Sequence, residues 1–409
     1  MSNWIKVKLG DIVELKRESY HPKPDEVLPY IGLEHIGQGT LRLISVGKSN
    51  EVTSTKSYFS KGDILFGKLR PYFRKVVRPK FNGVCSTDIL VLTSKNPRKF
   101  NQTFLFYLMA SQEMIDLATA SSSGTKMPRA DWKVLQNLEI SIPEDVNEQE
   151  RIGKILETID DKIDINIRMN KTLEEMAMTL YKHWFVDFGP FQDEEFVESE
   201  LGMIPKGWKV IQVKDLGEVI TGKTPSTKVK EYYGDKIPFI KIPDMHGNVY
   251  IVKTETMLSE LGAQSQKNKM LPPNTVCVSC IATPGLVVLT SEMSQTNQQI
   301  NSVVCKEGVS PYFVYLFFKS ISDNIVTLGS GGTATLNLNK GDFSRIKLLM
   351  PTNEVMTGFN NKVESIFNLI KINSLNNIEL ENLRDYLLPR LLSGEIDVSK
   401  AEKQVEEVL

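Results

Sequence analysis

The sequence predicts an α/β (α+β) protein with an internal repeat: two similar mixed α/β domains separated by two long antiparallel coiled-coil helices, related by a pseudo-two-fold. Two observations predict this architecture. A seven-residue apolar repeat extends over five heptads from Ile152, and it returns in the same register from Phe359, 207 residues later. The segment before each of these repeats also contains the same series of expected strands and helices. Sustained apolar heptads are typical of coiled coils.

Both predicted seams are mainly apolar and are interrupted by Asn near the middle. The seam positions are Ile152, Leu156, Ile159, Ile163, Asn166, Asn170, Leu173, Ala177, Leu180 and Trp184 in the first helix, and Phe359, Val363, Ile366, Ile370, Asn373, Asn377, Leu380, Arg384, Leu387 and Leu391 in the second. A seam Asn costs stability and specifies register. Antiparallel helices would bring the Asn layers face to face, although a parallel pair could match them too. Two unrelated amphipathic helices with Asn in solvent remain an alternative.

The domain boundaries follow from these helices and from a run of Pro, Gly and acidic residues after the first one. We expect a domain at 1–146, a spacer helix at 147–186, a linker at 187–203, a second domain at 204–351, a second spacer helix at 352–394 and a tail at 395–409. Each helix would span on the order of 55 Å at about 1.5 Å per residue, which matches roughly 16 base pairs of DNA.

The two predicted domains open alike, with Trp4 before Leu-Gly-Asp-Ile and Trp208 before Leu-Gly-Glu-Val. Expected strands follow in the same order, at 28–32, 63–66 and 88–92 in the first domain and at 237–241, 276–281 and 300–305 in the second. A helix then contains 106–108 or 314–316, a polar loop surrounds Gly124 or Gly332, and a last strand ends at Pro143 or Pro351. Duplicated patterns of this kind usually mean two copies of one domain.

Charge divides the chain in the same way. The net charge of the whole sequence is −1, but residues 1–146 carry +6 and residues 200–350 carry +4, whereas residues 147–199 carry −7 and residues 351–409 carry −4. Basic domains suit a polyanion such as nucleic acid, and acidic helices do not. Because these excesses are modest, charge alone favours nucleic acid only moderately.

The strongest binding pattern is the segment 61–80, which is rich in cations and has aromatic residues between them. We expect it to contact DNA through Lys61, Lys68, Arg70, Tyr72, Arg74, Lys75, Arg78 and Lys80. Lys and Arg neutralise phosphates, and Arg also reads guanine edges. Pro71 and Pro79 favour a loop or a strand edge over a helix. A basic hairpin exposed to solvent is the alternative.

The second domain has a thinner pattern in the loop 221–230. Its candidate DNA-binding residues are Lys223, Thr224, Ser226, Lys228 and Lys230. Hydroxyl and cationic side chains of this kind contact phosphates or bases, but an ordinary polar loop is an equal alternative. The loops around Gly124 and Gly332 offer backbone N–H groups to phosphate, or they are tight structural turns.

Catalytic motifs are not evident. The sequence has no Asn/Asp-Pro-Pro-aromatic turn, as an adenine methyltransferase would need, and no phosphate-binding P-loop. Cys277 and Cys280 lie three apart in a predicted strand, so they point to opposite faces and cannot share a metal. We therefore predict no catalytic residues and no metal site. The N-terminus lacks a signal-peptide pattern and no apolar run is long enough to span a bilayer, so a cytoplasmic location without membrane contact is expected.

The helical segments resemble a known family. The runs NEQERI at 147–152, LETIDDKI at 156–163, NKTLEEM at 170–176 and HWFVDF at 183–188 are very similar to the central spacer of the specificity subunits of type I restriction–modification systems. The run LLPRLLSGEI at 387–396 is similar to their C-terminal spacer. The resemblance covers essentially the whole chain.

This resemblance implies a non-catalytic DNA-recognition subunit with two target-recognition domains. It would read a bipartite, asymmetric target on double-stranded DNA, with each domain reading one half-site and the helices setting their spacing. It also implies two methyltransferase (modification) subunits and endonuclease/translocase (restriction) subunits as partners. S-adenosylmethionine, ATP and Mg would be bound by those partners and not by this chain. Base-contacting residues vary with the target in this family, so none is transferred.

Two other classes of function stay open. The chain could be a stand-alone DNA adenine methyltransferase or nuclease, although it shows no motif for either reaction. It could also be a coiled-coil adaptor whose domains bind protein. Methyl transfer by the purified chain would establish the first class, and the lack of a DNA footprint in the presence of a methyltransferase partner would favour the second.

Overall fold

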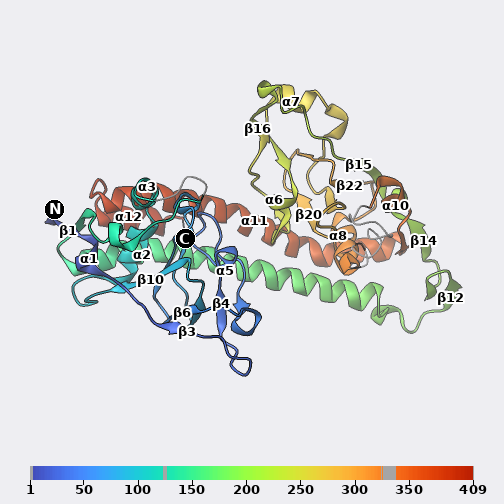
Figure 1. Ribbon diagram of the computed structural model, residues 1–409. Coiled ribbons are helices and arrows are strands. Elements are labelled where there is room, and N and C mark those ends of the chain that lie inside the picture. Colours follow the sequence, from blue (N-terminus) through green and yellow to red (C-terminus); the bar gives the residue numbers. More distant parts are fainter. Residues whose placement is uncertain (1–2, 123–126, 324, 326–337, 409) are drawn as a thin grey trace. The chain divides into compact units, whose positions relative to one another are not determined.

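The computed structural model describes residues 3–122, 127–323, 325 and 338–408. Figure 1 labels many of its helices and strands. The chain divides into two compact units: the first unit comprises Met1–Ile163 with Leu380–Leu409, and the second comprises Asp164–Glu379. Each unit therefore contains one α/β domain and parts of two long helices. Among the helices described, none combines the length and the apolar character that a membrane span requires.

The described residues of the first unit form three small sheets. Strands β1 (Trp4–Lys8) and β11 (Glu139–Pro143) form an antiparallel pair, with Trp4 opposite Pro143. The second sheet is antiparallel and has the order β2 (Val13–Leu15), β10 (Ile89–Ser94), β7 (Ile64–Gly67) and β8 (Val76–Val77). The third has the order β3 (Ser19–Tyr20), β6 (Lys56–Phe59), β9 (Gly83–Cys85), β4 (Pro29–Ile31) and β5 (Gly47–Lys48), in which β4 and β9 are parallel.

Short helices complete the first unit (Figure 1). They are α1 (Leu9–Ile12), α2 (Gln102–Ala110), α3 (Gln112–Ala120), α4 (Trp132–Leu135) and α12 (Val398–Glu406), with 3-10 turns η1 (Leu33–His35), η2 (Ser49–Glu51) and η3 (Pro71–Phe73). Helices α2 and α3 begin at N-caps: the side chains of Asn101 and Ser111 accept hydrogen bonds from the backbone N–H groups of Phe104 and Met114. Such caps satisfy donors that the first turn leaves free.

The second unit repeats this plan. Strands β14 (Lys209–Gln212) and β23 (Lys347–Met350) form the antiparallel pair. The central sheet has the order β15 (Gly217–Thr221), β22 (Ile300–Cys305), β19 (Val276–Ser279), β20 (Val287–Thr290) and β17 (Tyr250–Ile251), and a third sheet has the order β18 (Met257–Leu258), β16 (Tyr233–Ile240) and β21 (Gln295–Thr296). Its first four central strands correspond in order to β2, β10, β7 and β8 of the first unit, so the predicted internal repeat is confirmed.

The remaining elements of the second unit are short. They are helices α6 (Ile242–Met245), α7 (Glu260–Gln264), α8 (Pro311–Ser320) and α10 (Lys340–Arg345), and the 3-10 turns η4 (Gly189–Phe191), η5 (Val213–Asp215), η6 (Lys230–Tyr232) and η7 (Lys267–Lys269). The segment 187–203, predicted as a linker, contains η4 and most of a hairpin formed by β12 (Phe196–Ser199) and β13 (Gly202–Pro205). The segment 395–409, predicted as a tail, contains α12, whose Val398, Ala401 and Val405 belong to the first unit's core.

Two helices of 40 residues each follow the two domains: α5 (Val146–Phe185) and α11 (Asn353–Leu392). Their seams do not form an isolated coiled coil. The first unit's core contains Ile152, Ile159 and Leu387 together with sheet and α2 residues, and the second unit's core contains Ala177 and Phe359 in the same manner. Each domain thus completes its apolar core with parts of both helices.

The predicted Asn layers pair across the seam of the second unit. The Nδ2 of Asn166 donates to Oδ1 of Asn377 at 2.8 Å, and the Nδ2 of Asn373 donates to Oδ1 of Asn170 at 2.9 Å. Asn166 and Asn373 are buried. Because the partner number falls as the residue number rises, α5 and α11 run antiparallel there, as predicted.

A charged network occupies the seam in the first unit. Arg384, only 1% exposed, donates to Oδ1 of Asp160 at 2.7 Å and lies 3.2 Å from Asp385. Arg42 and the hydroxyl of Tyr107 also donate to Asp160, at 3.1 and 2.8 Å. Burial acts to lower the pKa of Arg384, but the Asp160 and Asp385 carboxylates outweigh it and the net pKa is raised. A guanidinium at a seam position is tolerated because its charge is paired.

Candidate nucleic-acid interface

The basic segment 61–80 forms a hairpin in the first unit. Strand β7 pairs with β8, with Leu65 opposite Val77. The connecting turn contains η3, and Arg70 and Arg74 flank it with φ angles of 50° and 49°. The left-handed conformation costs a residue other than Gly about 1–2 kcal/mol, so the surrounding contacts hold this turn in a strained shape. Such strain is concentrated at functional sites.

Three of the predicted DNA-binding cations form ion pairs with the long helices. Arg78 pairs with Glu157 of α5 and also donates to the hydroxyl of Thr103 at 2.6 Å. The Nζ of Lys80 lies 2.7 Å from Asp161 of α5.

The third of these cations, Arg74, is held from two sides. Its Nε donates to the carbonyl of Ala110 at 2.7 Å, and its Nη1 lies 3.6 Å from Asp385 of α11. Burial lowers the pKa of Arg74, an effect that Asp385 opposes. The sequence predicts contact with DNA for Arg74, Arg78 and Lys80, and the structure gives each an intramolecular partner that competes with such a contact.

Two lysines of the segment bond to backbone carbonyls. The Nζ of Lys68 donates to Thr87 and the Nζ of Lys75 donates to Leu33. Burial lowers the pKa of Lys75. Lys61 is exposed, and its backbone N–H donates to Asn82.

Arg70 and Tyr72 differ from the rest of the segment. The side chain of Tyr72 is 50% exposed, and its ring contacts Phe73 edge-on with centroids 4.7 Å apart. The guanidinium of Arg70 lies 6.0 Å from the Phe73 ring centroid. Its Nε is buried and has no hydrogen-bond partner among the residues described. An exposed aromatic ring beside an Arg over a second ring is an arrangement suited to nucleic acid.

A neighbouring cation was missed by the sequence analysis. The backbone N–H of Arg70 donates to the carbonyl of Pro128, and Arg129 pairs with Asp88 at 3.2 Å while its side chain stays 58% exposed. Arg129 therefore lies beside the turn that contains Arg70, where it bridges to Leu69. Its position just after the polar loop could have marked Arg129 as a candidate. Its pairing with Asp88, 41 residues earlier, follows from no local pattern. Gly124 and Gly332, the centres of the two polar loops, lie outside the described residues.

In the second unit, the predicted loop 221–230 borders a Gln-rich turn. Lys223, Ser226, Lys228 and Lys230 are exposed, and the hydroxyl of Thr224 donates to Oε1 of Gln298 at 2.7 Å. The backbone N–H of Lys223 donates to the carbonyl of Thr296. Gln298 is exposed and was not predicted, although Gln and Asn are the side chains that read adenine edges.

The four cysteines are buried or nearly so and unpaired. Cys277 belongs to one core cluster and Cys280 to another, as expected for strand residues on opposite faces. Burial raises the pKa of Cys277 to about 12 and that of Cys280 to about 11. Within the described part of the chain, no cluster of three or more His, Cys, Asp or Glu side chains is placed to hold a metal ion.

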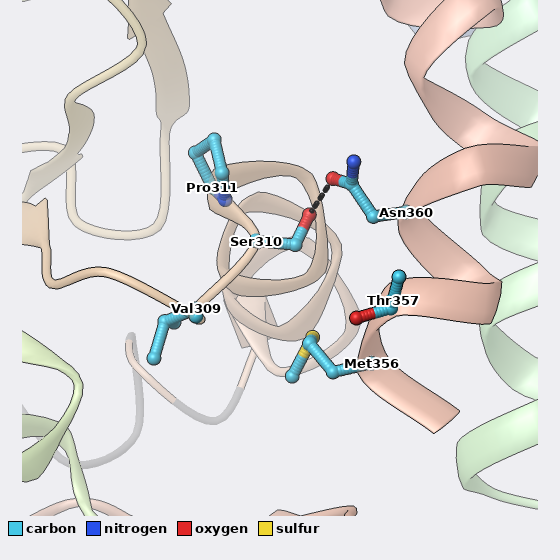
Figure 2. Close-up of a pocket in the computed structure, with 7 residues that line it drawn as sticks. Val309, Ser310, Pro311, Met356, Thr357 and Asn360 are labelled. Atoms are coloured by element: carbon cyan, nitrogen blue, oxygen red, sulfur yellow. Dashed lines mark hydrogen bonds between the residues drawn. The ribbon is translucent and has the colours of Figure 1, made fainter. Parts of the chain in front are cut away.

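A pocket of about 280 Å³ lies in the second unit, between the start of α8 and the first turns of α11. Figure 2 shows the Ser310 hydroxyl and Asn360 facing one another, and the hydroxyl donates to Oδ1 at 2.7 Å. The equivalent of Asn360 in the first repeat is Gly153, where an added Cβ would meet the Phe104 nitrogen at 2.9 Å. The residues that line the pocket are uncharged, so it offers no acid or base for catalysis.

Comparison with known proteins agrees with this repeat. The chain matches the family described as type I restriction modification DNA specificity domain at residues 1–175 and again at 205–382. The type I restriction enzyme HindI specificity subunit of Haemophilus influenzae is 35% identical over 464 residues, covering 97% of this chain and 100% of that protein. The MjaIX specificity subunit of Methanocaldococcus jannaschii is 28% identical over 331 residues, 76% of each chain.

A solved structure has the same fold. The type I restriction-modification system S subunit from M. genitalium gives a TM-score of 0.56 at 16% identity, covering 95% of this chain and 96% of that chain. The double family match coincides with the two structural repeats, and the HindI relative extends over nearly the whole sequence. The chain therefore belongs to the type I restriction modification DNA specificity family.

Proposed function

We propose that this chain is the DNA-reading specificity subunit of a type I restriction–modification complex. One observation carries the proposal: the DNA specificity domain occurs twice in the chain, on two units with the same strand order. Each domain reads one half-site of double-stranded DNA. Such a role predicts a cytoplasmic location, where cellular DNA is accessible.

The target is bipartite and asymmetric under this proposal. The candidate DNA-contacting side chains of the two domains differ. The first domain has Arg70, Tyr72 and Arg129, and the second has Lys223 and Gln298 among others. Different side chains on a repeated backbone select different bases, so the half-sites differ. Helices α5 and α11, at about 1.5 Å per residue, set the spacing between them.

Methyltransferase subunits dock on the long helices. In the second unit, α5 exposes Ile165, Met169 and Met176 at spacings of four and seven residues, which place them along one side of the helix. Helix α11 exposes Leu369, Ile372 and Leu375, which are three residues apart. Exposed apolar stripes mark protein interaction sites. Ile372 is the repeat equivalent of Ile165, which supports two copies of the partner.

The chain itself is non-catalytic in this proposal. The pocket beside α8 has an uncharged lining, and no cluster of three or more His, Cys, Asp or Glu side chains among the described residues is placed to hold a metal ion. S-adenosylmethionine binds to the methyltransferase subunits, and ATP and Mg bind to the restriction subunits. These partner subunits supply the methyl transfer and the cleavage.

The test is methyl transfer from labelled S-adenosylmethionine to DNA by the purified chain, the purified methyltransferase, and the two together. We expect transfer at specific sites only from the mixture. Transfer by the chain alone would establish an enzyme and overturn the proposal. Sequence-independent transfer by the mixture would remove the DNA-reading role and favour an adaptor.

A further inference from the structure

The turn after β7 in the first unit has a structural counterpart after β19 in the second. Arg70 is the third residue after β7, and Ala282 is the third after β19; both adopt left-handed backbone, with φ of 50° and 66°. Neither is Gly, the residue that adopts this conformation without steric cost. The repeat thus retains an unfavourable backbone shape although the side chain has changed from Arg to Ala.

Both turns are fixed by the same two backbone contacts. The N–H of Lys68 donates to Asp88 and that of Cys280 donates to Gln299, each at 2.8 Å, which ties each turn to the residues just before the long central strand. The second contact is with the segment before the last strand: the N–H of Ala130 donates to the carbonyl of Lys68 at 3.0 Å, and that of Leu338 donates to the carbonyl of Cys280 at 2.9 Å. A fixed frame that presents different side chains is what a base-reading element requires.

The side chain of Arg70 is prepared for such a contact. Arg74 and Arg78 are occupied by Asp385 and Glu157, whereas the buried Nε of Arg70 has no partner among the described residues. The guanidinium lies over the ring of Phe73, 6.0 Å from its centroid. A planar guanidinium held in this way matches the O6 and N7 acceptors of guanine, which it binds through two hydrogen bonds.

We propose that Arg70 is the base-reading residue of the first domain, that it selects a guanine in one half-site, and that the Ala282 turn occupies the same place at the other half-site. This inference rests on the DNA-reading function proposed above. It goes further because it assigns one base position to one side chain. Tyr72, half exposed beside it, contacts the neighbouring nucleotide.

The test maps methylated adenines by long-read sequencing in a host without other adenine methylation, which expresses the chain with its methyltransferase. The main variant is Arg70→Gly, because Gly favours the left-handed backbone while the guanidinium is lost. Arg70→Asn, which also tolerates this backbone, gives an independent second variant. The matched control is Lys23→Ala, an exposed cation of the same domain whose side chain is 71% exposed.

We expect Arg70→Gly to relax one guanine position in one half-site, with about tenfold or greater loss of discrimination there, and to leave the other half-site unchanged. The intact half-site shows that the variant has folded. Lys23→Ala should methylate the original motif. Ala282→Arg should alter only the other half-site.

Three results would overturn the assignment of Arg70. They are an unchanged motif in both Arg70 variants, weaker methylation at every site with the same motif, and relaxation in both half-sites together. The second result would make Arg70 a phosphate contact. Failure of the proposed function itself looks different, because the unaltered chain would then yield no motif at all.

Discussion

Asn166 and Asn377 are hydrogen bonded to each other across the seam between α5 and α11, with Nδ2 and Oδ1 2.8 Å apart. Asn373 and Asn170 form the neighbouring layer. Each layer joins the two helices, so a shift by one heptad would leave buried amides without partners. The layers therefore specify the antiparallel register at a cost in stability.

The Asn pair gives a prediction for stability. Asn166→Ala alone should lower the free energy of unfolding by about 1–3 kcal/mol, because it leaves a cavity and removes the partner of Asn377. The double variant Asn166→Leu with Asn377→Leu should be at least as stable as the unaltered chain. Urea unfolding measures both, with exposed Asn376→Ala as a control expected within about 0.5 kcal/mol. If the double variant has a lower free energy of unfolding than the single variant, the Asn pair itself stabilises the seam.

Arg384 gives a second prediction. Arg384→Ala should lower the free energy of unfolding by about 3 kcal/mol, because Asp160 loses its closest cation in a buried site. Arg390→Ala is the matched control on the same helix, since its partner Glu395 is 66% exposed and the pair should contribute less than about 1 kcal/mol. Equal effects from the two variants would contradict a structural role for the buried network.

The basic hairpin should divide into structural and DNA-contacting cations. Arg78→Ala should reduce stability while leaving the salt dependence of DNA binding unchanged, because its guanidinium pairs with Glu157. Lys61→Ala, at an exposed cation, should reduce the slope of log affinity against log salt by about one. Filter binding at several salt concentrations measures both slopes. A flatter slope of log affinity against log salt for Arg78→Ala would show that Arg78 contacts DNA.

The burial of the four cysteine thiols predicts that the native protein resists alkylation. Burial raises the pKa of Cys85, Cys277 and Cys305 to about 12 and that of Cys280 to about 11, so at pH 8 all four stay protonated and shielded. A thiol reagent at pH 8 should label the native protein slowly and label four cysteines after unfolding in guanidinium. Rapid labelling of Cys277 or Cys280 in the native state would contradict their placement in the core.

The helices give a prediction about target spacing. Deletion of 164–170 from α5 together with 373–379 from α11 removes one heptad from each helix and both members of each Asn pair. The helices shorten by about 10.5 Å, or about three base pairs. We expect the unread spacer of the target to shorten or the complex to fail to assemble. An unaltered spacer would contradict the role of the helices in setting the spacing, and Asn376→Ala, an exposed substitution that leaves the length of α11 unchanged, serves as the control.

Local patterns were sufficient to predict the repeat and its elements. The heptads predicted helices that begin and end close to Val146–Phe185 and Asn353–Leu392, and β22 occupies the predicted residues Ile300–Cys305. These features depend on apolar periodicity and strand propensity, which are written in neighbouring residues. The opposite faces of Cys277 and Cys280 followed from strand geometry in the same way.

Contacts between distant residues were not predictable in this way. Arg74 and Arg78 looked like free cations because their partners, Asp385 and Glu157, lie far along the sequence. Arg384 looked like a break in an apolar seam until its distant partner Asp160 was placed beside it. Charge composition cannot distinguish a cation that pairs internally from one that contacts DNA.

The central claim is that two domains of one chain read two different half-sites. Mapping of methylated adenines in a methylation-free host that expresses the chain with its methyltransferase tests this most directly. The account predicts one asymmetric motif with two specified parts separated by an unread spacer of fixed length. A single contiguous motif, a palindrome, or methylation without any motif would contradict it.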